Sequence, residues 1–566
     1  MRGVGVSQGI AIGKALVLKE ENVSIEQKSR RSPGEELERL QATLVSVRQK
    51  LEEIKRKATL ELGDKAQILD AQILVTQDEE LLGAVRGNIE GGMTVEAALE
   101  IGVEFYVKIL EGMDNEYMRE RAADLRDVGG RLIRHLLGIE QQDLAALTED
   151  YIIVARDLTP TDTASMNKAH VLGFVTDIGG RTSHSAIMAR SLEIPAIVGT
   201  KDGTSRIKTG DLLILDVLEG EVIIEPDPQQ VDLYEKRRAA LEEEKKRLLK
   251  LKTQPSISAD GHKVELAANI GTPKDCESAL HNGAEGIGLF RTEFLYLNRS
   301  NLPTEEEQFA AYKSVLETMA PRPVVIRTLD VGGDKELSYL NLPRESNPFL
   351  GYRAIRVCLE QTDIFRTQLR ALLKASAFGN LKIMFPMISS LDEVRQAKAL
   401  LEEVKAELIK EGVTVSAKIE VGIMIEIPAA AIISDVLAKE VDFFSIGTND
   451  LIQYTTAVDR MNERIAHLYT PFHPAVLRLI QMVIENGHQA GIWVGMCGEA
   501  AGDTDLIPLF LGMGLDEFSM SAISLLPARE LIGHLNLEEL EKKVPEILQS
   551  GTAQEVKVKL KVLGGS

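Results

Sequence analysis

The sequence has few cysteines, few aromatic residues and no long apolar run. Its three cysteines, Cys276, Cys358 and Cys497, lie far apart and form no CxxC pair, which argues against a disulfide framework or a cysteine zinc site. No apolar stretch approaches the ~20 residues of a membrane span. Residues 4–13 are broken by glycines and polar residues and lack the continuous core of a signal peptide. We therefore expect a cytoplasmic protein with reduced thiols and no membrane association.

Positive charge is also in deficit, because 65 Lys and Arg face 86 Asp and Glu, a formal net charge of -21. Such a surface repels nucleic acid and anionic membranes, and it suits a basic protein partner. A small anionic substrate would then need a locally basic pocket, so clustered arginines are the feature to look for. No GxxxxGK[ST] segment is present, so the sequence gives no support for a Walker-type nucleotide site.

The N-terminal part of the chain changes pattern twice. Its start alternates like strands. A capping box at residues 32–35, with Pro33 at the first helical position, then opens a long helical pattern. Strand patterns return at 151–155, 171–176, 196–198 and 212–225. Residues 1–228 thus predict an α/β domain with a helical bundle inserted at about 22–145. This insertion is either a structural subdomain or a docking surface, and the pattern leaves both readings open.

The C-terminal part alternates strand and helix. A charged helix and a break at 253–258 predict a linker at 229–258. Residues 259–566 then contain eight apolar strand candidates, at 264–268, 286–290, 324–328, 382–387, 421–425, 442–446, 492–496 and 516–520. Eight such units predict a closed (β/α)8 barrel of the TIM type. A doubly wound sheet is the alternative, but no GxGxxG follows the first strand.

Charged and polar residues follow five of these strands, at the end where a barrel carries its active site. They are Arg291, Arg327, Glu426, Asn449, Asp450 and Cys497, with Arg460 further along the chain. Arginine forks suit phosphate and carboxylate oxygens. Glu426 and Asp450 offer oxygen ligands for Mg²⁺, with a substrate phosphate completing the shell. Each residue alone has a simpler structural reading, but their recurrence at one face favours a site.

A second candidate site lies in residues 179–190, which contain two glycines, Arg181, His184 and then a helical pattern. His184 is expected near the helix N-terminus, where the helix dipole disfavours imidazolium and leaves a nucleophilic nitrogen. The same helix end and Arg181 would stabilise an attached phosphoryl group. Thr163 is a weaker candidate to orient the histidine ring. The other eight histidines are read as structural.

These segments resemble the enzyme I family of the bacterial phosphoenolpyruvate-dependent sugar phosphotransferase system. Residues 179–190 are similar to its phosphohistidine signature, and residues 442–451 with Arg460 to its second signature. The resemblance covers essentially the whole chain. It implies a swivelling phosphohistidine domain whose helical insertion docks the histidine phosphocarrier protein. It also implies a phosphoenolpyruvate-binding (β/α)8 barrel that forms a homodimer.

The resemblance implies a role for each of these residues, and it supplies the substrate and the proton donor, which the residues alone did not. It implies that His184 is phosphorylated at Nε2 and that Cys497 protonates the enolate to give pyruvate. Glu426 and Asp450 would hold Mg²⁺. The residues implied to bind phosphoenolpyruvate are Arg291, Arg327, Asn449, Asp450 and Arg460.

The implied reaction is transfer of the phosphoryl group from phosphoenolpyruvate to His184 and then to the carrier, the first step of sugar uptake. His184 and the barrel belong to different domains, so the linker is the expected hinge. One rival is a pyruvate phosphate dikinase or phosphoenolpyruvate synthase, which needs a nucleotide-binding domain before the histidine, where this chain has strands and the insertion. A non-catalytic docking protein is the other, and the intact histidine, arginine and metal positions argue against it.

Overall fold

The computed structural model describes the chain except for a set of short segments. These are residues 19–24, 63–67, 113–115, 140–143, 145–146, 160–161, 164–165, 168, 181–182, 193, 298, 300, 334–336, 338, 341, 344, 463 and 564–566. The chain divides into two compact units, Met1–Glu244 (unit 1) and Lys245–Ser566 (unit 2). Each unit is described by itself.

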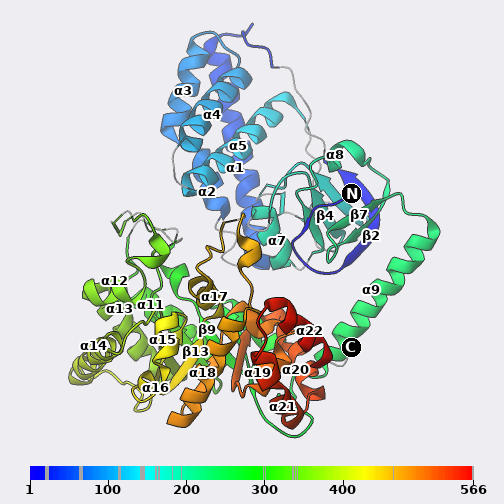
Figure 1. The fold of residues 1–566 in the computed structure, drawn as a ribbon. Helices are drawn as coiled ribbons and strands as arrows, with labels where there is room; N and C mark the ends of the chain where they lie inside the picture. Colours follow the sequence, from blue (N-terminus) through cyan, green and yellow to red (C-terminus); the bar gives the residue numbers. More distant parts are fainter. Residues whose placement is uncertain are drawn as a thin grey trace. The chain divides into compact units, whose positions relative to one another are not determined.

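Unit 1 contains a helical bundle that follows strand β2 in the chain (Figure 1). Its helices are α1 (Pro33–Leu62), α2 (Ile68–Val75), α3 (Glu79–Glu90), α4 (Val95–Glu111) and α5 (Glu116–Leu137). The predicted capping box is present, because Ser32 and Glu35 exchange side-chain and backbone hydrogen bonds. Buried residues such as Leu44, Val85 and Leu99 form a core of the bundle's own. The predicted helical insertion is therefore confirmed.

The described residues of unit 1 also form a seven-stranded sheet, in the order β1-β5-β4-β3-β2-β6-β7. Its strands are β1 (Val4–Gly5), β2 (Ile10–Val17), β3 (Tyr151–Ala155), β4 (Val171–Thr176), β5 (Ala196–Val198), β6 (Leu212–Asp216) and β7 (Glu221–Ile224). The predicted strand pattern at 212–225 is in fact two strands, β6 and β7, paired antiparallel. Separate apolar clusters cover the two faces, and α7 (His184–Leu192) belongs to one of them through Ala186 and Ala189. The short helix α8 spans Gly203–Arg206.

Helix α9 (Pro228–Leu249) lies where the linker helix was predicted. In unit 1 its residue Tyr234 is buried against Ile10 and Ile214, and Arg237 pairs with buried Asp216 at 2.9 Å. In unit 2 its end contributes Arg247, which pairs with Glu530. Both ends of this charged helix are thus attached by side chains, each within its own unit.

The described part of unit 2 contains a closed barrel, with all its neighbouring strands parallel (Figure 1). The strands are β8 (Glu265–Ile270), β9 (Gly286–Phe290), β10 (Pro323–Arg327), β11 (Asn380–Phe385), β12 (Glu420–Ile425), β13 (Phe443–Ile446), β14 (Trp493–Met496) and β15 (Glu517–Met520). Each overlaps one of the eight predicted candidates. The barrel prediction is confirmed, and the doubly wound alternative is wrong.

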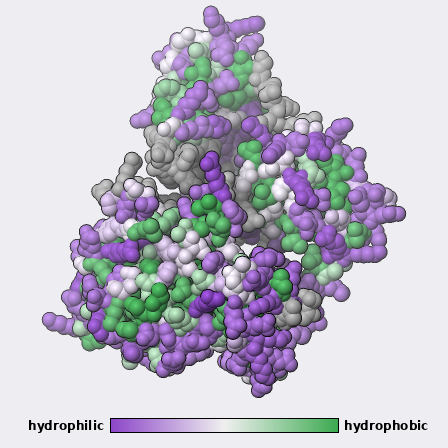
Figure 2. Space-filling model, viewed as in Figure 1, coloured by the Kyte–Doolittle hydropathy of each residue, from purple (hydrophilic) through white to green (hydrophobic). Residues whose placement is uncertain are grey.

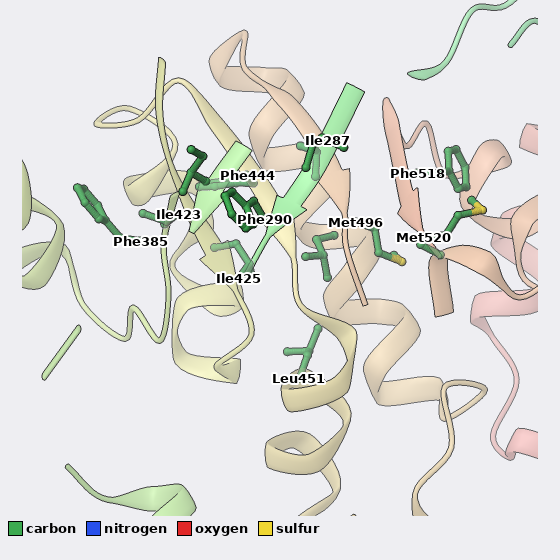
Figure 3. Packing of buried hydrophobic residues seen from close by; sticks show 14 of the residues in the cluster. Ile287, Phe290, Phe385, Ile423, Ile425, Phe444, Leu451, Met496, Phe518 and Met520 are labelled. Atoms are coloured by element: carbon green, nitrogen blue, oxygen red, sulfur yellow. The ribbon is translucent and has the colours of Figure 1, made fainter. Parts of the chain in front are cut away.

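Helices surround this barrel. They are α10 (Asp275–His281), α11 (Glu305–Met319), α12 (Ile355–Glu360), α13 (Thr362–Ala375), α14 (Leu391–Lys410), α15 (Pro428–Ile432), α16 (Ser434–Leu437), α17 (Thr448–Thr456), α18 (Pro474–Ala490), α19 (Ile507–Gly512), α20 (Leu525–His534), α21 (Leu537–Leu548) and α22 (Ala553–Leu563). Short 3-10 turns are η2 (Glu293–Leu295), η3 (Pro348–Leu350), η4 (Ser376–Phe378), η5 (Ala466–Leu468), η6 (Glu499–Gly502) and η7 (Ala522–Ser524). Figure 3 shows part of the large hydrophobic cluster of unit 2, with Ile423 and Ile425 of β12 and Leu451 of α17.

The barrel interior is packed in layers. An apolar layer holds Leu289, Val325, Met384, Met424 and Phe443, together with Cys497. Towards the amino ends of the strands lies a polar plug, which consists of Glu265, Lys382, Glu420, Trp493 and Glu517. Within the plug Lys382 pairs with Glu420 at 3.0 Å and lies 4.1 Å from the Trp493 ring. Side chains therefore fill the interior, and we expect the active site at the carboxyl ends of the strands.

The surface is mainly polar. Figure 2 shows hydrophilic residues over most of the drawn face, with hydrophobic ones gathered near α15 and α16. Ile432 and Val436 of these helices are exposed. Among the helices that the structure describes, none is long and apolar enough to cross a membrane.

Candidate active site

Arg327, the last residue of β10, is buried at the carboxyl end of the barrel. Its guanidinium pairs with Asp330 at 2.9 Å and with Glu293 of η2. Burial alone would lower the pKa of Arg327, but Glu293 and Asp330 raise it well above its ordinary value. The arginine is therefore a permanent, rigidly held cation facing the strand ends.

A second buried arginine, Arg353, lies beside the first. It pairs with Asp330 at 2.9 Å and with Asp450 at 3.5 Å, and it donates to the Tyr454 hydroxyl at 3.2 Å. The next residue, Ala354, has φ +54°, a strained backbone region for a side-chain-bearing residue. The surrounding fold thus holds Arg353 in place at an energetic cost.

Two carboxylates complete this cluster. Glu426 follows β12, and one of its oxygens accepts the backbone N–H of Met387 at 2.6 Å. The pKa of Glu426 is raised to about 8, mainly by burial and then by the nearby charges of Asp450 and Asp330, while Arg327 and Arg353 oppose the shift. Oδ1 of buried Asp450 has no hydrogen-bond partner within bonding distance. Met387 itself has φ +54°.

This carboxylate pair suits a hard divalent cation. Mg²⁺ is usually held by one or two carboxylates plus substrate phosphate, and a cation here would relieve the mutual repulsion and burial that raise the pKa of Glu426. The unpartnered Asp450 oxygen is a ready ligand. Among the described residues no group of three or more His, Cys, Asp and Glu side chains could hold a metal. A pair of carboxylates leaves the other ligand positions of such an ion to substrate phosphate and water.

Asn449 and Asp450 occupy the first turn of α17, directly after β13. Backbone N–H groups at such a helix end are unpaired within the helix and attract anions. The Asn449 side chain exchanges hydrogen bonds with Glu499, at 3.4 Å and 3.1 Å. Arg460 approaches Asp450 Oδ1 at 3.6 Å. The structure thus brings Asn449, Asp450 and Arg460 to one place.

Cys497 follows β14 and is buried at the top of the interior layer. Burial raises the pKa of its thiol to about 11, while Ser445, Arg327 and Arg291 lower it and Glu426 raises it. A thiol with this pKa stays protonated at neutral pH. Cys497 is therefore a neutral thiol, able to give up a proton rather than to act as a thiolate nucleophile.

Arg291 follows β9 and is exposed, and its electrostatic effect on Cys497 places its charge near the cluster. The six residues predicted at strand ends, together with Arg460, thus lie at the carboxyl end of one barrel. Sequence reasoning missed Arg353, because it follows η3 in a long loop and no strand precedes it. It also left Glu293 and Asp330 without a role, and here they anchor Arg327.

His184 is the first residue of α7, at the helix N-terminus where it was predicted. Its side chain and all of Arg181 lie outside the described part of the chain. Thr163 is buried, and its hydroxyl donates to the Thr159 carbonyl at 3.1 Å. Whether Thr163 orients the His184 ring stays a prediction.

Three family models match the chain in succession. Residues 2–121 match the N-terminal domain of PEP-utilising enzymes, and residues 147–220 match their mobile domain. Residues 245–537 match their PEP-binding domain. The arginine and carboxylate cluster falls in the PEP-binding match, and His184 falls in the mobile-domain match.

Relatives match the chain along its length. A phosphoenolpyruvate-protein phosphotransferase of Geobacillus stearothermophilus is 57% identical over 558 residues, covering 98% of this chain and 96% of the relative. One of Bacillus subtilis is 56% identical, covering 98% of each chain. A solution structure titled Enzyme I (nEIt) is 44% identical, covering 43% of this chain and 99% of that chain, with a TM-score of 0.39. By its identity to these curated relatives, the chain belongs to the phosphoenolpyruvate-protein phosphotransferase, or enzyme I, family.

Proposed function

We propose that this chain takes the phosphoryl group of phosphoenolpyruvate onto His184 and passes it to a histidine phosphocarrier protein, the first step of sugar uptake by the phosphotransferase system. The observation that carries this proposal is the cluster of buried arginines and carboxylates at the carboxyl end of the barrel. That cluster offers fixed positive charge to a small anion inside a chain of net charge -21.

Substrate binding is assigned to side chains that reach this cluster. Arg327 is held by two carboxylates and can offer its remaining N–H to a phosphate. Arg291, Arg460, Asn449 and Asp450 are proposed to share the phosphate and carboxylate of phosphoenolpyruvate with it. Fixed donors of this kind stabilise charge without reorganising during the reaction.

Glu426 and Asp450 are proposed to hold Mg²⁺. When bound, the ion would neutralise charge on the phosphoryl oxygens and orient the phosphate. The two carboxylates need such a counter-charge, because both are buried and Asp450 raises the pKa of Glu426.

The chain's own groups then carry out the transfer. Nε2 of His184 attacks phosphorus in line, so that an N–P bond forms as the P–O bond to the enolate breaks. The enolate takes a proton at its methylene carbon from the Cys497 thiol and becomes pyruvate. The resulting thiolate regains a proton from water. In a second step the phosphoryl group passes from His184 to a histidine of the carrier.

The domain assignment stays a proposal with its predicted bounds. Residues 1–228 are assigned to the phosphohistidine domain, with the carrier-docking insertion at about 22–145. Residues 229–258 are the linker and hinge, and 259–566 the barrel. The docking role is supported by the insertion's separate hydrophobic core. Because the helices pack around this core, their outer faces are not needed to cover the sheet. Adding the carrier should protect amides of α2–α5 from hydrogen exchange and leave the barrel amides unchanged.

We also propose that the barrel forms a homodimer. Large hydrophobic side chains exposed on unit 2, including Leu350, Ile409 and Ile432, support this proposal. Sedimentation at rising protein concentration measures it, and a monomer at every concentration would contradict it.

Pyruvate release tests the function. With Mg²⁺ and a histidine phosphocarrier protein present, phosphoenolpyruvate should yield pyruvate and phosphorylated carrier in equal amounts. The Arg327→Met variant should lose this activity by about 10²-fold or more. Exchange of phosphate between ATP and inorganic phosphate would favour the dikinase or synthase rival. Carrier binding without any pyruvate release would favour the docking protein.

A further inference from the structure

Three hydrogen bonds join Asn269 of β8 to its barrel neighbour β15 and to the residue that follows β14, the next strand round the barrel. The Asn269 amide Nδ2 donates to the Cys497 carbonyl at 3.0 Å and to the Ser519 carbonyl at 3.3 Å. Its Oδ1 accepts the Ser519 hydroxyl at 2.6 Å. The orientation of this amide is set by its partners, because the flipped form would point Oδ1 at two carbonyl oxygens.

The Cys497 carbonyl has no partner in the regular ladder. Strand β14 pairs with β15 only as far as Met496 and Phe518, so Cys497 lies one residue beyond the last pair. On the opposite side the Cys497 N–H donates to the Ile446 carbonyl at 3.1 Å. Asn269 therefore supplies the bond that the missing strand pairing would have given, and both backbone groups of Cys497 are satisfied.

The turn after Cys497 is held from its other side. A Cβ on Gly498 would lie 1.8 Å from Thr448 Oγ1, so the turn is wedged against the start of α17. The backbone N–H of Glu499 donates a hydrogen bond to Asn449 Oδ1 at 3.1 Å. On the side of β8, the Asn269 amide holds the Cys497 carbonyl at 3.0 Å. Ser519 is fully buried and fixes the Asn269 side chain.

We propose that Asn269, braced by Ser519, is a positioning residue that aims the Cys497 thiol at one face of the enolate. This inference rests on the proposed function of Cys497 as the proton donor. A proton must reach one face of a planar methylene carbon, so a displacement of the thiol of about 1 Å costs up to about 10²-fold in rate. Neither Asn269 nor Ser519 needs to touch the substrate for this role.

The test uses Asn269→Ala and Ser519→Ala in the full chain. The matched control is Asn282→Ala, because Asn282 also donates to a backbone carbonyl, that of Ser278 at 2.9 Å, but at an exposed helix end. Asn269→Ala should slow pyruvate formation from phosphoenolpyruvate by about 10-fold to 100-fold, with KM changed by less than about 3-fold. Ser519→Ala should give a smaller effect in the same direction. Transfer from phosphorylated His184 to the carrier should be unchanged.

Stereochemistry separates positioning from a general structural role. The substrate is phosphoenolpyruvate labelled with tritium at one C3 position, used in D₂O, and the chirality of the pyruvate methyl group is measured. The parent and Asn282→Ala should give a chiral methyl group, and Asn269→Ala should give partly racemic product. Full chirality and an unchanged kcat in Asn269→Ala would overturn the proposal. If that variant fails to unfold cooperatively, Ser519→Ala is judged by the same criteria.

The same assay distinguishes failure of the underlying function. Cys497→Ala should give racemic methyl groups, because solvent then protonates the enolate. If Cys497→Ala gave the parent's chirality, Cys497 would not be the donor and the proposal on Asn269 would fall with it. If His184 gained no phosphoryl group in the parent, the proposed function itself would be wrong.

Discussion

At the residue scale, the site contains arginines of two kinds. Arg353 is 2% exposed and paired with Asp330 and Asp450, whereas Arg291 is exposed. Arg353→Met should therefore break the buried ion pairs of Arg353 with Asp330 and Asp450, of which Asp330 keeps Arg327, and destabilise the protein by about 3 kcal/mol. Arg291→Met should leave stability within about 0.5 kcal/mol of the parent. Thermal unfolding of both variants measures the contrast, and equal melting temperatures would contradict it.

The three thiols give a second prediction at this scale. All are buried, and burial raises the pKa of Cys276 to about 12 and of Cys497 to about 11, with Cys358 raised further. Because a thiolate is the reactive species, the native protein at about pH 8 should react with an aromatic disulfide reagent only slowly, while the unfolded chain should titrate three thiols at once. Rapid reaction of any one thiol in the native protein would contradict this prediction.

Strand-end residues could be read from the sequence because a barrel places each polar residue after an apolar run at the same face. Arg327, Glu426 and Asp450 were found in this way. Arg353 could not be found, because its place depends on how a long loop folds back to Asp330. The role of Asn269 was equally hidden, since the strand pattern does not show where pairing ends.

At the scale of elements, the β14–α17 contact depends on Gly498. A Cβ there would meet Thr448 Oγ1 at 1.8 Å and Thr448 N at 2.6 Å, so Gly498→Ala must push the Cys497 turn away from α17. We expect a loss of stability of about 1–3 kcal/mol and a loss of His184 phosphorylation of about 10²-fold. Gly533→Ala in α20 is the control, because its Cβ would come no closer than 4.0 Å to any atom. Parent-like activity in Gly498→Ala would contradict the prediction that the close contact between Gly498 and Thr448 fixes the Cys497 turn.

The polar plug of the barrel predicts a dependence on pH. The pKa of Glu517 is raised from its ordinary value of 4.5 to about 8, mainly by burial and then by the nearby Glu265. The folded protein keeps this proton where the unfolded chain has lost it, so stability falls as pH rises from about 4.5 to about 8 and remains lowered above that. Glu517→Gln removes this loss. Its stability relative to the parent should increase by about 4 kcal/mol between about pH 5 and about pH 9.

Denaturant unfolding at the two pH values measures this difference. The control is Glu402→Gln, at an exposed position of α14, which should show no such change in stability between the two pH values. A constant difference between Glu517→Gln and the parent would mean that Glu517 is ionised in the barrel. Most strands and helices were predictable because their patterns are local, whereas the contacts within this plug depend on barrel closure, which the pattern does not specify.

At the scale of the whole molecule, the proposed reaction needs both units. His184 belongs to unit 1, and the arginine cluster belongs to unit 2. Crosslinking the units in one arrangement should block one half-reaction and spare the other, because phosphoenolpyruvate and carrier are used by different parts of the chain. Rates of His184 phosphorylation and of transfer to the carrier are measured separately. Persistence of both rates after complete crosslinking would exclude the domain swing.

The order of domains could be predicted because the composition changes at each boundary, from alternating strands to helices and then to the charged linker. The two compact units meet between Glu244 and Lys245, inside α9. That position could not be predicted, since the helical pattern runs through it without a break.

The most direct test of the central claim is the intact mass of the protein after mixing with phosphoenolpyruvate and Mg²⁺, beside a His184→Ala variant. The account predicts that the parent alone gains one phosphoryl group, labile in acid and stable in base. No gain in the parent, or an equal gain in His184→Ala, would contradict it.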